Sequence, residues 1–185
     1  MSHLRRLQSV ADFLDAIAEG TGRLISWLTL GMVWVTFLIV VLRYAFGLGW
    51  IAMQESVGYM HALVFMLGAA YTLKHDGHVR VDILYRGFSP RTQAWVDLLG
   101  TLFLLVPVSA FLIWVSWDYV TASWSLREAS PQAGGLPGVF LLKSVIPLMA
   151  ALLLAQGLAQ ALRCLLVLRG DPGAAPEHAE HEPEL

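Results

Sequence analysis

The sequence contains little cysteine and little charge. Cys164 is the one cysteine in 185 residues, which excludes an intramolecular disulfide framework and a zinc site built from cysteine pairs. Charged residues make up 14% of the chain, against about 25% in a typical globular protein. The net charge of −2 and the lack of a basic stripe argue against nucleic-acid binding. The first 23 residues lack an apolar run followed by a cleavage site, so we do not expect a signal peptide there.

Apolar residues dominate what is present. They account for 57% of the chain, the mean hydropathy is +0.62, and the charges fall in short islands between long apolar runs. A bilayer core of about 30 Å needs about 20 helical residues, and four runs meet that length. The sequence therefore predicts an all-α integral membrane protein with a single membrane domain over residues 1–170. The predicted transmembrane helices cover residues 24–42, 56–73, 94–120 and 139–165.

The N-terminal segment differs from these runs. Residues 2–19 place apolar side chains on one side of a helix and charged ones, including Asp15 and Glu19, on the other. This pattern is typical of an amphipathic helix lying in the membrane interface. Gly20 and Gly22 then permit a turn into the bilayer.

Basic residues are distributed unevenly between the two sides of the membrane. With the N-terminus in the cytoplasm, nine of the 12 lysines and arginines fall on the cytoplasmic side, and Arg43, Arg127 and Lys143 fall outside. The positive-inside rule therefore predicts that both termini are cytoplasmic. Residues 171–185 are polar and contain proline, so we expect a disordered cytoplasmic tail.

Ionisable residues are nearly absent from the span centres, where each would cost at least about 2.5 kcal/mol. His61 is the deepest titratable side chain. Axial haem ligation by two histidines would need a second one on a facing helix, and no other span contains one. Gln54, His61, Gly68 and His75 recur every seven residues, which favours a hydrogen-bonding face that packs against protein.

Prolines and caps suggest where helices begin and bend. Ser89 followed by Pro90 predicts an N-cap and first turn for the third span, and we expect Pro137 to open the fourth. Pro107 and Pro147 lie inside these spans, where proline kinks a helix. Transporters also use broken helices at substrate sites, but no paired inverted repeat accompanies these prolines, which favours simple kinks.

A polar island, His-Asp-Gly-His-Val-Arg-Val-Asp at residues 75–82, follows the second span. One interpretation is a solvated turn in which Gly77 ends the helix. A metal site of His75, His78 and Asp82 is the alternative, although it lacks a fourth ligand at a recognised spacing.

Four stretches stand out, and they are Trp50–Glu55, Gly77–Asp82, Arg127–Pro131, and Leu136-Pro137 followed by Lys143 and Ile146-Pro147. Together they resemble the small membrane (Q) subunit of tripartite ATP-independent periplasmic (TRAP) transporters. The His-Val-Arg-Val-Asp run is the most specific of them, and the resemblance covers roughly residues 10–168. The outer loop departs from the family pattern at Gln132-Ala133-Gly134-Gly135, and the acidic tail has no counterpart in the family.

The resemblance implies a division of labour in a bacterial inner membrane. In the family, a periplasmic protein captures an organic anion such as a carboxylate or sialic acid. A large membrane (M) subunit then moves the anion with sodium by an elevator-type motion. The small subunit packs beside the large one and offers a periplasmic surface to the binding protein. It is not an enzyme and needs no cofactor.

The resemblance also suggests roles for individual residues as contacts within the chain or with the other subunits. His78, Arg80 and Asp82 would hold the cytoplasmic loop, and the intramembrane His61 would face protein. Two other classes stay open: the membrane anchor of a respiratory oxidoreductase and the small subunit of a tricarboxylate transporter. The residues expected toward the periplasmic end are Gln54, Glu55, Glu128, Ser130 and Lys143.

Overall fold

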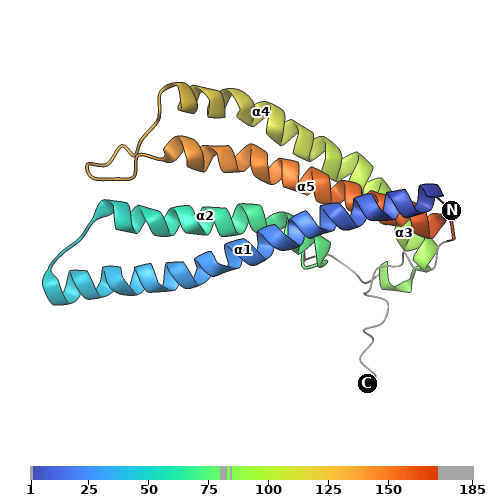
Figure 1. Ribbon diagram of the computed structural model, residues 1–185, viewed down its shortest axis with the longest axis horizontal. Helices are drawn as coiled ribbons and strands as arrows, with labels where there is room; N and C mark the ends of the chain where they lie inside the picture. The colour runs from blue at the N-terminus through green and yellow to red at the C-terminus, as the bar shows by residue number, and fades with distance from the viewer. Residues whose placement is uncertain (1, 80–82, 84, 171–185) are drawn as a thin grey trace, which may run out of the picture.

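The computed structural model describes residues 2–79, 83 and 85–170, and its long helices run back and forth along one direction (Figure 1). Four helical segments are long and apolar enough to cross a membrane, as the sequence predicted. The elements are α1 (Ser2–Phe46), α2 (Ile51–Lys74), the 3₁₀ turn η1 (Tyr85–Gly87), α3 (Pro90–Gly100), the π-turn η2 (Thr101–Leu105), α4 (Val106–Ser125) and α5 (Val139–Leu168).

Helix α5 is the central element of the fold. It packs against α1, α2, α3 and α4, whereas α4 packs substantially only on α5 and the adjoining η2. Helices α1 and α2 form one hairpin, and α4 and α5 form the other (Figure 1). We call the end with the connections 47–50 and 126–138 the loop end, and the opposite end, near residue 2 and residue 168, the terminus end.

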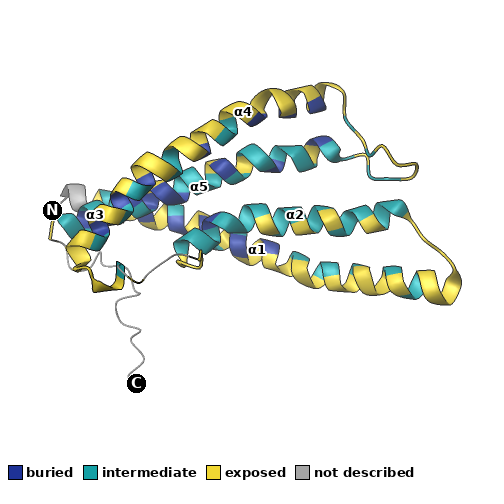
Figure 2. Cartoon of the chain, turned by 180° about the vertical axis from the view of Figure 1, so that it is seen from behind, coloured by how far each residue is buried: buried dark blue, intermediate teal, exposed yellow. Residues whose placement is uncertain are grey.

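The buried core is small and lies mainly at the terminus end (Figure 2). One cluster joins Ala94 and Leu98 of α3 to Ala161 and Cys164 of α5. In the most apolar stretch of each spanning helix, only 6% to 22% of the residues are buried. The outer surfaces of α1 and α4 near the loop end are largely exposed (Figure 2). The described chain therefore covers little of its own transmembrane surface.

Helix α1 differs from the prediction in one respect. Residues 2–19 are helical, but no turn follows, because the same helix continues through Gly20 and Gly22 for 45 residues in all. A helix of that length is about 68 Å long, roughly twice the bilayer core. Gly22 is needed for helix contact instead, since a Cβ there would collide with the side chain of Tyr71 on α2.

The third span begins and bends where the sequence suggested. Ser89 caps α3 by accepting a hydrogen bond from the Thr92 backbone N–H at 3.3 Å. Before Pro107, the chain forms η2, in which the N–H of Val106 bonds to the carbonyl of Thr101, five residues earlier. Proline lacks an N–H and clashes with the preceding turn, and the wider π-turn accommodates both effects.

Two helix ends correct sequence expectations. Helix α2 ends in a Schellman motif, in which Asp76 adopts the left-handed conformation with φ of 54°. The backbone N–H of Gly77 donates to the Thr72 carbonyl at 2.9 Å. The residue that ends the helix is therefore Asp76, one position before the predicted Gly77. Helix α5 starts at Val139 after an N-cap at Gly138. Pro137 therefore does not open the helix but lies in the loop, one residue before the N-cap.

Candidate functional site

A carboxylate at the start of α2 anchors the long loop between α4 and α5. The Ser130 hydroxyl donates to Glu55 Oε1, and the Leu136 backbone N–H donates to Glu55 Oε2 at 2.7 Å. Gly135 permits this approach, because a Cβ there would meet the Ser130 side chain and would lie 2.9 Å from Glu55 Oε1. Ser130 and Leu136 thus hold the loop against α2, and Gly135, in the segment that departs from the family pattern, leaves room for the contact.

A second carboxylate joins the same loop to α4 and α5. Arg127, with φ of 47°, reverses the chain after α4, so that Glu128 Oε2 accepts from Lys143 Nζ at 2.5 Å and from the Ser123 hydroxyl at 2.6 Å. Lys143 Nζ also lies 3.9 Å from the centroid of the Tyr119 ring. The hydrogen bond from Lys143, then that from the Ser123 hydroxyl, and last the charge of Lys143 lower the pKa of Glu128, which keeps the Glu128 carboxylate ionised.

Gln54 and His61 have a different environment. Both are exposed, and neither makes a side-chain hydrogen bond within the part of the chain that the structure describes. The His61 ring stacks on Phe65, with centroids 6.4 Å apart. The predicted hydrogen-bonding face of α2 is therefore not uniform. Its other two members contact α1, because Gly68 lies near Ile25 and His75 Nε2 lies 2.8 Å from Glu19 Oε2.

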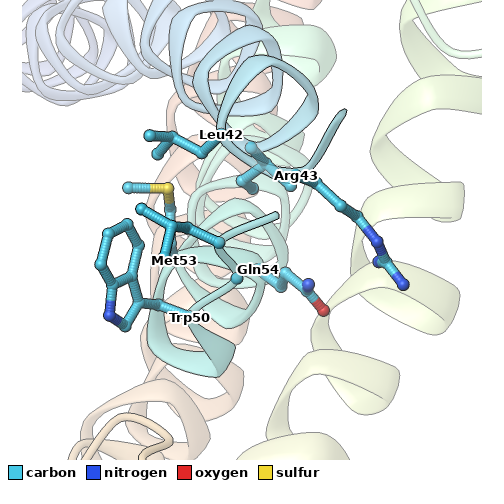
Figure 3. A pocket seen from close by; sticks show the side chains of 8 residues that line it. Leu42, Arg43, Trp50, Met53 and Gln54 are labelled. Atoms are coloured by element: carbon cyan, nitrogen blue, oxygen red, sulfur yellow. The ribbon is translucent and has the colours of Figure 1, made fainter. Parts of the chain in front are cut away.

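A small cavity lies where α1 turns into α2. Its volume is about 10 Å³ and its lining includes Arg43, Trp50 and Gln54, close to the space that one water molecule needs. Figure 3 shows the Arg43 guanidinium and the Gln54 carboxamide extending to the same side of the hairpin, away from Trp50. The cavity is too small for an organic solute.

The polar island after α2 is described only in part. His78 is exposed in the bend beyond α2, whereas Arg80 and Asp82 lie outside the described residues. Among the residues described, no three of the His, Cys, Asp and Glu side chains gather as metal ligands would.

Sequence reasoning missed a buried polar cluster between α1 and α5 at the terminus end. Asp15, only 6% exposed, accepts from Gln156 Nε2 at 2.8 Å and from the Arg163 guanidinium. Arg163 also reaches Asp12 at 3.4 Å. The available signal was the spacing of Ala11, Asp15, Ala18 and Gly22, which places small residues around one carboxylate on a single helix face.

Sequence reasoning also missed a tie between α1 and α2. Glu19 Oε2 accepts from Lys74 Nζ at 2.7 Å, and Glu19 Oε1 accepts from Arg23 Nε at 2.9 Å. The sequence pattern alone predicts that both carboxylates, Asp15 and Glu19, lie on the charged side of an interfacial helix. The arrangement joins the helices by polar ties at both ends and leaves their centres apolar. This fold defines a multi-pass helical membrane protein.

Comparison with known proteins identifies the family. Residues 32–167 match the model for tripartite ATP-independent periplasmic transporters, DctQ component. The chain belongs to this family, so it is a transporter component and not an enzyme. It is 28% identical over 152 residues to a Haemophilus influenzae protein described as a TRAP transporter small permease protein, covering 81% of this chain and 91% of the relative. No solved structure matches the chain.

Proposed function

We propose that this chain forms the fixed scaffold beside the large membrane subunit of a sodium-coupled TRAP transporter for organic anions. It lies in a bacterial inner membrane with both termini in the cytoplasm, so the loop end faces the periplasm. Substrate and sodium pass through the large subunit, and the periplasmic binding protein selects the anion. The family match favours this assignment over a respiratory membrane anchor or a tricarboxylate transporter subunit.

One observation supports the scaffold role above the others. Few residues of the spanning helices are fully buried, and in the most apolar stretch they make up 6% of the residues in α1 and 6% in α2. Membrane helices associate through van der Waals packing and interhelical hydrogen bonds. A chain with so little internal packing is suited to lie against another membrane protein, and its bare span centres suit a subunit that carries no substrate.

We also propose roles in the assembly for the polar residues at the two ends of the helices. At the loop end, Glu55 with Ser130 and Glu128 with Lys143 hold the loop 126–138 in one shape, and we assign this surface to contact with the binding protein. On the cytoplasmic side, we assign His78, Arg80 and Asp82 to contacts that hold the loop after α2 against helices of either subunit.

Co-purification tests the proposal. We expect a tagged copy of this chain, expressed with the large membrane subunit of its own transporter, to recover that subunit in near-equal amounts after mild detergent extraction. The same tag on an unrelated four-helix membrane protein is the control and should recover none. Recovery of this chain alone, folded and monodisperse, would contradict the scaffold role.

A further inference from the structure

The exposed residues of α2 form a single stripe. Of its 24 residues, those classed as exposed are Gln54, Gly58, His61 and Phe65. Their spacing of four, three and four places them on one face of the helix. Every other residue of α2 is buried or half-buried against the rest of the chain, so this stripe is the face that α2 presents outward.

The stripe carries hydrogen-bonding groups deep in the membrane. His61 is ten residues beyond Ile51, the first residue of α2, which places it about 15 Å along a helix of about 36 Å. Among the described residues, the His61 imidazole stacks on the Phe65 ring and forms no hydrogen bond. Hydrocarbon offers no donor or acceptor, so a polar group that faced lipid there would lose several kcal/mol of hydrogen bonding.

The outward face of α4 provides a contrast within the same chain. From residue 106 to 117, every exposed residue of α4 is apolar or aromatic, including Phe111, Trp114 and Val115, and the exposed Asp118 lies nearer the loop end. Such a face is suited to lipid chains, whereas the face with Gln54 and His61 is not. The outward faces of α2 and α4 therefore favour different neighbours.

Gly58 indicates what kind of neighbour the stripe would accept. A Cβ at Gly58 would meet nothing within 4 Å, so no contact inside this chain requires glycine. Small residues on a membrane helix let a second backbone approach closely. Gly58 lies one helical turn from the Gln54 carboxamide and one turn from the His61 imidazole. This arrangement suits a crossing helix that carries a hydrogen-bonding side chain of its own.

We infer that the Gln54–Gly58–His61–Phe65 stripe of α2 is the docking face for a transmembrane helix of the large subunit. That helix crosses at Gly58 and hydrogen-bonds to His61. At the loop end, Arg43 extends to the same side as Gln54 (Figure 3). The helix of the large subunit therefore presents a hydrogen-bond acceptor to Arg43 there as well. The inference rests on the proposed function and adds the surface through which the assembly forms.

Substitution in the stripe tests the inference in the co-expressed complex. Gly58→Leu should reduce recovery of the large subunit at least tenfold, because the side chain blocks the close approach. His61→Leu should weaken the apparent affinity about three- to thirtyfold, the range of interhelical hydrogen bonds in membranes. Trp114→Leu on α4 is the control and should stay within twofold. All three variants should keep wild-type abundance, because Gly58, His61 and Trp114 are exposed on the surface of the chain.

Photocrosslinking supplies a second measurement that does not depend on folding of the Gly58→Leu and His61→Leu variants. A benzophenone amino acid replaces Phe65, which is 74% exposed, or Trp114, which is 76% exposed. We expect position 65 to crosslink to the large subunit at several times the yield of position 114.

The outcomes separate the two proposals. Equal yields at positions 65 and 114, crosslinks from 65 to lipid or to a second copy of this chain, or wild-type recovery with Gly58→Leu would overturn the docking face. If the unmodified chain recovers no large subunit, the proposed function itself fails.

Discussion

Replacing Arg163 by methionine is expected to lower the free energy of unfolding by about 3 kcal/mol. Arg163 donates to Asp15, which is only 6% exposed. Without the guanidinium, this carboxylate would stay buried with one remaining donor, Gln156 Nε2, and a buried charge without its partner is strongly destabilising. Denaturant unfolding of the purified protein in detergent, followed by helical circular dichroism, measures the loss.

Two companion variants make this prediction specific. Arg169→Met removes an exposed arginine beyond the end of α5 and should change stability by no more than about 0.5 kcal/mol. Adding Asp15→Leu to Arg163→Met should restore part of the stability, because it removes the unpaired charge but leaves the buried Gln156 amide without its acceptor. If Arg163→Met behaves like Arg169→Met, the cluster between α1 and α5 does not contribute as described.

Gly22→Ala and Gly20→Ala are expected to change stability in opposite directions. A Cβ on Gly22 would lie 2.8 Å from Tyr71 Cβ and closer still to the ring. Because Tyr71 Cβ is fixed to the backbone, α1 and α2 must separate, which costs about 1 to 3 kcal/mol. A Cβ on Gly20 meets nothing within 4 Å, so alanine there should stabilise the helix by about 0.5 to 1 kcal/mol.

The pair also decides between two views of this segment. Thermal unfolding of both variants beside the wild type gives the comparison, with apparent melting temperatures moving down for Gly22→Ala and up for Gly20→Ala. A turn at these glycines, as the sequence alone suggested, would make both alanines unfavourable. The same loss in both variants would therefore refute the continuous helix.

The helical fold could be predicted from the sequence because bilayer thickness sets a length that four apolar runs satisfy. The Ser89 N-cap and the break before Pro107 were also predictable, since each depends on residues within one turn. The length of α1 was not, because glycine tolerates both helix and turn. Only the position of Tyr71 opposite Gly22 explains why a glycine is needed there.

The site was less predictable because its contacts join residues far apart in the chain. Gln156 and Asp15 are 141 residues apart, and Leu136 and Glu55 are 81 apart. A local pattern shows which residues are polar but not which helices come together. A local pattern therefore places the acidic residues of α1 on the charged side of the helix, although Asp15 faces α5 and Glu19 faces α2.

Uptake in liposomes tests most directly whether this chain is a scaffold without a transport path of its own. Liposomes that contain only this polypeptide, with binding protein outside and an inward sodium gradient, should accumulate no labelled organic acid above protein-free liposomes. Adding the large subunit of the same transporter should produce uptake. Accumulation by this chain alone would contradict the account.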